Sequence, residues 1–330
     1  MNAVPGPRRA AVIGSGGCGV AVAHRLAASG LFDSIVLTAR DGDRAHGRAL
    51  DIAHAGVIEG FTTTVTGIGA STDPREFQAI EGSEVVVIAA GQTRRPGMRR
   101  EDLTGANLAV VAAAAAAVRM FASDAIAIVL TNPLDEMTAL CHAVSGLPVA
   151  QVIGQAGVLD SARLRYAVAE RLRVPVAAVE AVTLGPHSEE MVPVLSGCRV
   201  RGQALSELVS QTVLAELGAR ARHGGGEVID LLRIGSTSVA PSAAVLSMVR
   251  ALRSGERTRL PVCTLLNGEY GIDGVFLGTS AILDGRGVVR VVEHELSPAE
   301  ALQLRAAAES ARARQSKLLA SVPAENCNSL

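Results

Sequence analysis

The sequence predicts an α/β fold, in which an N-terminal doubly wound parallel sheet is followed by a C-terminal α+β domain. Continuous apolar runs such as 84–90 (EVVVIAA) and 125–131 (AIAIVLT) are typical of strands buried on both faces. They alternate with helical stretches in the first half of the chain, which favours parallel pairing. After residue 154 turns interrupt the strand-like runs, which favours antiparallel pairing. We therefore predict two domains, residues 1–150 and 151–330.

The elements of the first half follow in order from this pattern. A glycine-rich turn at 14–19 (GSGGCG) separates the first strand from a helix that ends near residue 29. The apolar run 108–118 is too short to cross a bilayer and predicts a buried helix within 103–121. The predicted strands are 10–13, 34–38, 65–68, 84–90, 125–131 and 150–153, and a further helix is predicted over 44–54.

The second half is predicted to hold shorter strands between its helices. The helix over 205–222 should end at the triple glycine 224–226, because glycine is unfavourable in the interior of a helix. The last helix begins at Ser297, which can cap it, and Glu300 completes a capping box. The other predicted helices are 161–173 and 242–253, and the predicted strands are 179–184, 196–200, 262–266, 274–282 and 287–292.

The composition excludes several classes of protein. The 31 basic and 32 acidic residues nearly cancel, so a polybasic nucleic-acid-binding protein is not expected. The 48% of apolar residues suffices for a core, and the run into the first strand lacks the features of a signal peptide. The five cysteines are widely spaced, which predicts neither a disulfide framework nor a metal site. We expect a cytoplasmic protein without a membrane partner.

The glycine-rich turn has the spacing of a dinucleotide-binding motif, G-x-G-x-x-G. Its first glycine allows the tight turn, its second lets a pyrophosphate approach the backbone, and its third permits close packing of helix on strand. The helix N-terminus adds N–H donors for the phosphates. A turn without a ligand is the alternative, but the position between strand and helix favours a Rossmann domain. The predicted cofactor-binding residues here are Gly14, Gly16, Gly17, Cys18 and Gly19.

The end of the second predicted strand bears on the choice of cofactor. An acidic residue that binds the ribose of NAD is expected near Ala39, but Thr38 and Arg40 stand on either side of it. Arg40 could instead pair with a 2′-phosphate, which favours NADP(H). In the alternative, Arg40 is solvated and Asp41 or Asp43 reaches the ribose, so NAD(H) stays possible.

Polar residues suited to catalysis follow the buried strands. Four arginines lie in 91–100 (GQTRRPGMRR), where the carboxyl end of a strand can bind ligands, and Asn132 follows the next strand. Asp160 and Arg163 share one helix face, and His187 lies in GPHSEE. Taken singly, these residues fit a solvated charge run, an ion pair and a structural histidine. Their joint occurrence in this order favours an active site.

With these motifs the chain resembles the lactate/malate dehydrogenase family, and within it the lactate-dehydrogenase-like malate dehydrogenases. The resemblance runs over about residues 10–315 and implies a Rossmann domain, a substrate domain and a homodimer or homotetramer. It implies an NAD(P)-dependent 2-hydroxy-acid dehydrogenase that interconverts oxaloacetate and (S)-malate. The motifs that carry it are GSGGCG, AAGQTRRPGMRREDL, LTNPLDEMT, VIGQAGVLDSARLR, GPHSEEMVP and LNGEYG.

The resemblance also implies roles for single residues. His187 resembles the acid/base and Asp160 the carboxylate that orients it. Arg100 resembles the arginine that polarises the reacting carbonyl, Arg163 the clamp on the 1-carboxylate, and Arg94 the arginine that binds the distal acidic group.

Further positions resemble the family's cofactor contacts and pocket. Asn132 resembles the residue that touches both substrate and nicotinamide, before an expected cis bond to Pro133, while Gly91 and Asn107 match cofactor contacts. Thr237 lies in GSTSVAP, where the family has GSA-aromatic-aromatic-AP, so it is a candidate substrate-binding residue of altered size and polarity.

The sequence therefore predicts an NADP-preferring reductase of a dianionic 2-oxo acid, with oxaloacetate as substrate. Because Arg94 requires only an anionic tail, phosphonopyruvate is an alternative substrate. An alternative of another class is an NADP-binding sensor without turnover.

Overall fold

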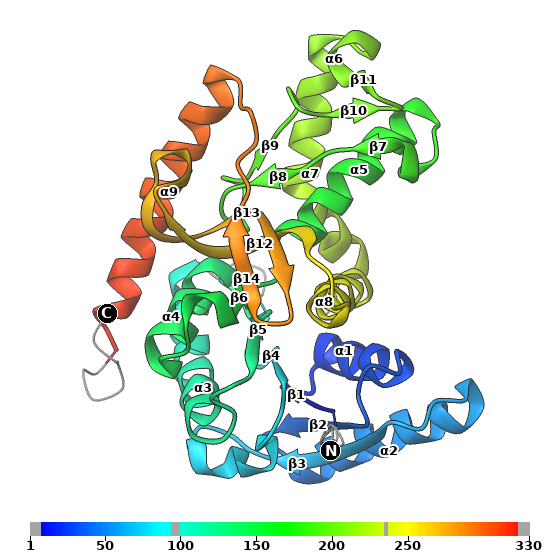
Figure 1. Ribbon diagram of the computed structural model, residues 1–330, viewed down its shortest axis with the longest axis vertical. Helices are drawn as coiled ribbons and strands as arrows, with labels where there is room; N and C mark the ends of the chain where they lie inside the picture. Colours follow the sequence, from blue (N-terminus) through cyan, green and yellow to red (C-terminus); the bar gives the residue numbers. More distant parts are fainter. Residues whose placement is uncertain (1–7, 94–99, 234–236, 323–330) are drawn as a thin grey trace, which may run out of the picture.

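The computed structural model describes residues 8–93, 100–233 and 237–322, which surround a nine-stranded sheet (Figure 1). Six strands pair in parallel in the order β3-β2-β1-β4-β5-β6, which is a doubly wound Rossmann arrangement as predicted. The order reverses between β1 and β4, and ligands bind at the carboxyl ends of strands beside such a point. The strands are β1 (Arg9–Ile13), β2 (Ser34–Ala39), β3 (Thr64–Gly69), β4 (Val85–Ile88), β5 (Ile126–Val129) and β6 (Val152–Gly154).

Three antiparallel strands extend the same sheet beyond β6. They are β12 (Thr258–Asn267), β13 (Asp273–Asp284) and β14 (Gly287–Val291), all predicted as antiparallel strands. The sequence did not predict that β12 would pair with β6, at Cys263 and Gly154. A Cβ on Gly154 would lie 2.8 Å from that of Cys263, so the missing side chain permits this approach. The domain boundary near residue 150 stays a prediction, because this sheet runs across it.

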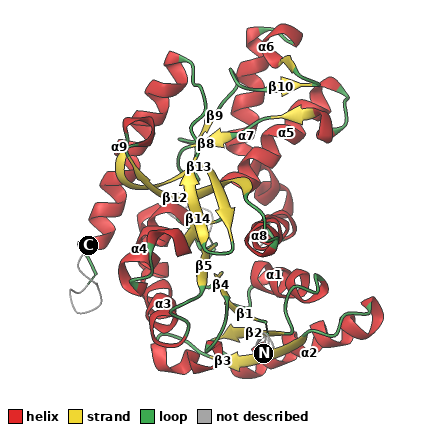
Figure 2. Cartoon of the chain, viewed as in Figure 1, coloured by secondary structure: helices red, strands yellow, loops and turns green. Residues whose placement is uncertain are grey.

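Helices cover both faces of the parallel strands, which explains why those strands are apolar throughout (Figure 2). Ala11 and Ile13 of β1 face the core beside α3 and α4, while Ala10 and Val12 face the core beside α1 and α8. The helices are α1 (Gly17–Ala28), α2 (Gly42–Glu59), α3 (Arg100–Phe121), α4 (Leu134–Ser145), α5 (Gly157–Leu172), α6 (Leu205–Leu208), α7 (Gln211–Leu232), α8 (Val239–Arg253) and α9 (Pro298–Leu319).

Short elements complete the chain. The predicted strand over 179–184 is divided into two separate strands, and the one over 196–200 is confirmed only at its end. The short strands are β7 (Val179–Glu180), β8 (Thr183–Leu184), β9 (Val192–Pro193), β10 (Arg199–Val200) and β11 (Gln203–Ala204). Four 3₁₀ turns lie at η1 (Pro74–Ile80), η2 (Val149–Gln151), η3 (Val176–Ala178) and η4 (Glu269–Gly271).

Helix boundaries follow capping chemistry. Asp41 caps α2 by accepting a hydrogen bond from the backbone N–H of Arg44, and Gly60 ends the helix with a φ of 82°, so α2 is longer than the predicted 44–54. The capping box at Ser297 and Glu300 of α9 is confirmed.

The prediction that the triple glycine ends a helix is wrong. Helix α7 begins at Gln211 and continues through residues 224–226 to Leu232. Leu214, Leu217 and Ala221 of α7 are buried in the core that also contains α5 residues, and this packing outweighs the low helix propensity of glycine.

Helix α3 contains the apolar run predicted to be buried. Its segment Asp102–Phe121 has a mean hydropathy of 1.5 and is long and apolar enough to cross a membrane by length and composition alone. In the fold its face with Val111, Ala114 and Val118 is fully buried, and α3 packs on α4 and η1, as the core helix of a globular fold does.

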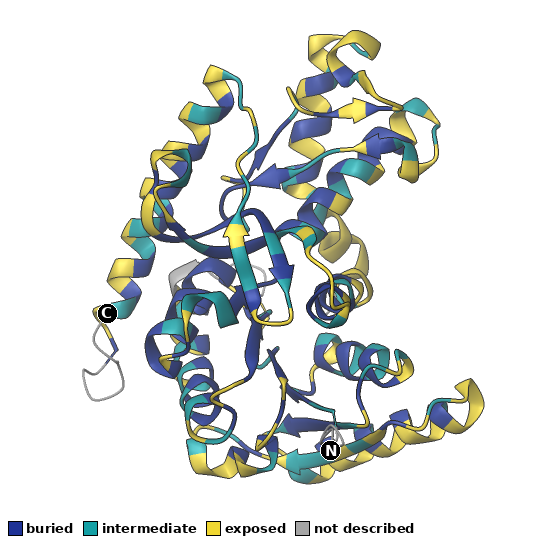
Figure 3. Ribbon diagram, viewed as in Figure 1, coloured by how far each residue is buried: buried dark blue, intermediate teal, exposed yellow. Residues whose placement is uncertain are grey.

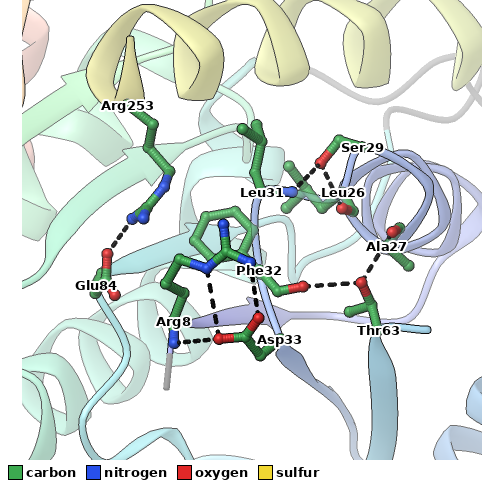
Figure 4. A network of polar contacts seen from close by, with 10 residues as sticks. All are labelled: Arg8, Leu26, Ala27, Ser29, Leu31, Phe32, Asp33, Thr63, Glu84 and Arg253. Atoms are coloured by element: carbon green, nitrogen blue, oxygen red, sulfur yellow. Dashed lines mark hydrogen bonds and ion pairs between the residues drawn. The ribbon is translucent and has the colours of Figure 1, made fainter. Parts of the chain in front are cut away.

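A polar network joins the end of α8 to the N-terminal strands (Figure 4). Arg253 forms an ion pair with Glu84, just before β4, and its guanidinium lies over the ring of Phe32 at 5.1 Å. Arg8 pairs with Asp33 at 2.7 Å before β2. Helix α8 is thereby fixed to the amino ends of the parallel strands, whereas ligands bind at their carboxyl ends.

Candidate active site

The turn after β1 has the geometry that an anionic cofactor requires. Gly14 has a φ of +109°, and a Cβ there would lie 2.5 Å from the backbone nitrogen of Ala90. A Cβ on Gly19 would lie 1.8 Å from the carbonyl oxygen of Gly14, so helix and strand meet too closely for a side chain. Cβ atoms on Gly16 and Gly17 would meet no atom within 4 Å, which leaves the N-terminus of α1 open. This turn can therefore receive a pyrophosphate.

The other predicted cofactor residues near this turn differ in accessibility. Thr38 is buried, and its carbonyl accepts a hydrogen bond from the N–H of Gly14 at 3.1 Å, while Arg40 is exposed just beyond β2. The carboxylate of Asp41 is engaged in capping α2. Burial raises the pKa of the Cys18 thiol to about 11, so this residue is neutral beside the turn.

Asn107 joins two loops at the carboxyl edge of the sheet. Its Oδ1 accepts a hydrogen bond from the N–H of Gln92 at 2.7 Å, and its Nδ2 donates to the carbonyl of Asn132 at 2.7 Å. Its side chain is buried and thus supports the segments that carry Gly91 and Asn132. Asn132 is exposed, and its bond to Pro133 is cis as expected. Direct contact of Asn107 with a cofactor stays a prediction.

His187, Asp160 and Arg163 come together although the histidine is 27 residues from the aspartate. His187 follows β8, and the other two lie in the first turns of α5. Nδ1 of His187 lies 2.7 Å from one carboxylate oxygen of Asp160, and Nη1 of Arg163 donates to the other at 3.1 Å. The Asp160 side chain is only 4% exposed, so both interactions are shielded from water.

The electrostatics of this cluster favour a protonated histidine. Burial and the positive charge of Arg163 lower the pKa of His187. The charge and hydrogen bond of Asp160, together with the charge of Asp135, raise the pKa by more, so the net shift is upward. Because Nδ1 faces Asp160, Nε2 is the ring nitrogen available to a ligand.

Contacts from several elements fix the loop that carries His187. Gly185 has a φ of +88° and pairs its backbone with Gly278 of β13, at N–O distances of 2.9 and 3.1 Å. The N–H of His187 donates to Oδ2 of Asp135, at the start of α4, at 2.8 Å. Arg222 of α7 donates to the carbonyl of Met191 at 3.1 Å.

An arginine of the C-terminal helix also reaches this loop. Nε of Arg314 donates to Glu136 of α4 at 2.9 Å, and its Nη2 lies 2.9 Å from a carboxylate oxygen of Glu190. Sequence reasoning missed Asp135, Glu136 and Arg314. Asp135 and Glu136 could have been found as acidic residues in the first turn of a helix that starts at the ligand-binding edge. No sequence signal connects Arg314 to the site.

Some predicted site residues fall outside the described part of the chain. Arg94 lies there, and Arg100 begins α3 but its side chain is outside the described atoms. Thr237 is half-buried just before α8. Among the described residues, no group of three or more His, Cys, Asp or Glu side chains could hold a metal ion.

Two family models match the chain in sequence. The lactate/malate dehydrogenase NAD binding domain matches residues 8–154, and the lactate/malate dehydrogenase alpha/beta C-terminal domain matches residues 157–321. A malate dehydrogenase of Staphylococcus carnosus is 40% identical over 301 residues, which are 91% of this chain and 94% of that protein.

Solved structures are similar along nearly the whole chain. The malate dehydrogenase of Cryptosporidium parvum has a TM-score of 0.90 at 30% identity and covers 95% of this chain and 99% of its own. The lactate dehydrogenase of the same organism, complexed with lactic acid and β-nicotinamide adenine dinucleotide, has a TM-score of 0.91 at 32% identity. It covers 97% of this chain and 100% of its own.

Proposed function

The chain belongs to the lactate/malate dehydrogenase family, and we propose that this 2-hydroxy-acid dehydrogenase reduces oxaloacetate to (S)-malate in a reversible reaction. The observation that supports this most directly is the cluster of His187, Asp160 and Arg163 at 2.7 and 3.1 Å. It combines a proton donor, a carboxylate that holds it and a cation for a carboxylate substrate. Relatives named malate dehydrogenase at 36–40% identity support oxaloacetate as the substrate.

His187 performs the proton transfer in this proposal. A reduced nicotinamide cofactor, held through its pyrophosphate at the turn 14–19, would supply a hydride to the carbonyl carbon and would itself be oxidised. The carbonyl oxygen takes the proton of His187 from Nε2. As the new C–H and O–H bonds form, the C=O double bond becomes a C–O single bond. The carboxylate of Asp160 stabilises the imidazolium before transfer and fixes the ring through Nδ1. In the reverse direction neutral His187 accepts the hydroxyl proton.

Arg163 is the proposed clamp on the 1-carboxylate. One of its nitrogens donates to Asp160, and its planar guanidinium has further N–H donors for a bidentate contact. Arg94, Arg100 and Thr237 complete the proposed substrate site on sequence grounds: Arg94 binds the distal acidic group and Arg100 the reacting carbonyl. The cation at position 94 favours a dianionic substrate over pyruvate.

We also propose that NADP(H) is the preferred cofactor and that NAD(H) can replace it. The turn 14–19 and the first turn of α1, which carries no acidic side chain, suit the pyrophosphate. Arg40 is exposed at the end of β2, where the 2′-position of the ribose is expected, and Asp41 is occupied in capping α2.

A cytoplasmic homodimer or homotetramer completes the proposal. Cys18, Cys141, Cys198 and Cys263 are free thiols, which suits a reducing compartment. Val57 and Ile58 of α2 are 86% and 87% exposed, an unusual exposure for branched apolar side chains (Figure 3). Beside them, Glu59 and Val239 line a cavity of about 410 Å³ between α1 and α8. We propose that a second copy of this chain covers this surface.

Initial rates in a matrix of cofactors and substrates test the function. NADPH and NADH are each paired with oxaloacetate, pyruvate and phosphonopyruvate, and loss of the reduced nicotinamide is followed. We expect the highest kcat/KM with NADPH and oxaloacetate, and His187→Ala should lower kcat by about 10²–10⁴-fold. A higher kcat/KM with phosphonopyruvate would mean that the protein is a reductase of a 2-oxo acid but that its substrate is phosphonopyruvate. Cofactor binding without turnover of any 2-oxo acid would favour a sensor.

The same assay tests Arg40. We expect Arg40→Ala to raise the KM for NADPH by roughly tenfold or more, because a charge-assisted contact is lost, and to leave the KM for NADH nearly unchanged. Arg44→Ala is the matched control, since Arg44 is also exposed but lies a turn further along α2. Equal effects of Arg40→Ala on both cofactors would contradict the phosphate contact.

A further inference from the structure

Helix α7 passes directly over the side chain of Arg163 with two of its three consecutive glycines. A Cβ on Gly224 would lie 3.2 Å from Cδ of Arg163 and 3.6 Å from its Cγ. A Cβ on Gly225 would lie 3.2 and 3.3 Å from the two terminal guanidinium nitrogens. The absence of side chains at these positions therefore sets how closely the helix approaches the arginine.

The third glycine has a different environment. A Cβ on Gly226 would meet no atom within 4 Å, although this residue belongs to the same helix and is the next along the chain. Closeness to Arg163 thus distinguishes Gly224 and Gly225 from a neighbour with the same local backbone. The three glycines provide an internal comparison.

Arg163 is held from two sides. Asp160, on its own helix, accepts a hydrogen bond from Nη1, and the glycine-bearing stretch of α7 lies against the methylenes and the guanidinium. A guanidinium binds a carboxylate with two N–H groups only when its plane is correctly oriented. Because the end of an arginine side chain moves easily, a methyl group at position 225 would displace it by a few tenths of an ångström without preventing folding.

We propose that Gly224 and Gly225 are positioning residues for substrate binding, which keep the Arg163 guanidinium in the orientation that receives the 1-carboxylate. This inference rests on the proposed function, in which Arg163 is the carboxylate clamp. This role explains why glycines occur inside helix α7 although they disfavour helix formation. Without side chains at these positions, the helix can pack closely against Arg163.

Gly225→Ala and Gly226→Ala test the proposal as a matched pair. We expect Gly225→Ala to raise the KM for oxaloacetate and the inhibition constant of oxamate by about tenfold, since a slightly misplaced binding group weakens a bidentate contact. The KM for the nicotinamide cofactor and the kcat should change much less. Gly226→Ala should leave all these constants near those of the wild type. Gly224→Ala should fall between them, because it meets only the methylenes of Arg163.

The melting temperature distinguishes a change in the position of Arg163 from a general loss of folding stability. Alanine is the better helix former, so Gly226→Ala should raise the melting temperature, and Gly225→Ala should not lower it by much. Equal oxamate inhibition constants for the two variants would overturn the proposal. A wild type that turns over no 2-oxo acid would instead refute the proposed function, and the two failures are thereby distinguished.

Discussion

His187 and Arg163 share a single carboxylate, and this sharing governs the expected pH dependence. Burial lowers the pKa of His187, but the charge and hydrogen bond of Asp160 raise it further than burial lowers it. Reduction of the carbonyl requires protonated His187, so kcat/KM for reduction should be high at low pH and fall as pH rises through this pKa. Oxidation of the hydroxy acid requires neutral His187 and should show the opposite limb.

Asp160→Asn tests this coupling. Removal of the carboxylate charge lowers the pKa of His187, so the fall in reduction rate should move to lower pH, and kcat at neutral pH should drop by roughly 10²-fold or more. The measurement is kcat/KM against pH in both directions. Asp135→Asn is the control, because Asp135 accepts a hydrogen bond from the backbone N–H of His187 and its charge raises the pKa of His187 less than that of Asp160 does. An unshifted profile in Asp160→Asn would contradict the role of the carboxylate.

Among the helices, α9 shows how an element distant in sequence can support the site. Its Arg314 joins Glu136 of α4, whose side chain is 3% exposed, to Glu190 in the loop of His187. Ser310, one turn earlier, accepts a hydrogen bond from Arg314 at 2.6 Å and donates one to Glu190 at 2.8 Å. The loop is therefore held by charge-assisted hydrogen bonds in addition to its own backbone contacts.

Arg314→Met should destabilise the protein and reduce activity together. Loss of the hydrogen bonds to charged partners should lower the free energy of unfolding by about 1.5–3 kcal/mol, and kcat should fall because the His187 loop loses its support from α9. Urea unfolding and steady-state rates measure both. Arg305→Met, on an exposed face of the same helix, is the matched control and should change the free energy of unfolding by less than about 0.5 kcal/mol. Equal effects of the two substitutions would argue against a role of Arg314 in supporting the His187 loop.

For the assembled protein, the exposed apolar surface of α2 leads to a prediction about association. Helix α2 lies far from α9 in the fold (Figure 1). We expect the wild type to have the mass of a dimer or tetramer by light scattering, and Ile58→Asp to lower that mass, because a buried unpaired charge opposes association. Leu302→Asp is the control, since Leu302 is 70% exposed on α9. A monomeric wild type would contradict the proposed surface.

Much of the fold could be predicted because its signals are local. The six parallel strands, the helix at the glycine turn and the capping box follow from apolar runs, glycine spacing and side-chain capping. Helix α4 was not predicted. Every residue of it except His142 is buried, including the charged Asp135 and Glu136, so its polar residues do not mark a solvent-exposed face. Helix propensity alone predicts that α7 ends at the triple glycine, and the packing of α7 on α5 overrides this preference.

The candidate site likewise contains residues that the sequence predicts and contacts that it does not predict. The order of motifs was sufficient to predict that His187, Asp160 and Arg163 belong together, and the structure brings them within hydrogen-bonding distance. Arg314 and the contact of Gly225 with Arg163 could not be foreseen, because each depends on a partner more than 50 residues away.

By itself the sequence determined the α/β class, the position of the glycine turn and the set of chemical groups at the carboxyl edge of the sheet. These follow from periodicity, propensity and residue type, which act over a few positions. Only the tertiary structure decided that β12 joins the parallel sheet, that α7 runs unbroken past Arg163 and that α9 holds the His187 loop. Those outcomes depend on the packing and charge pairing of distant segments, whose energies exceed the local preferences they override.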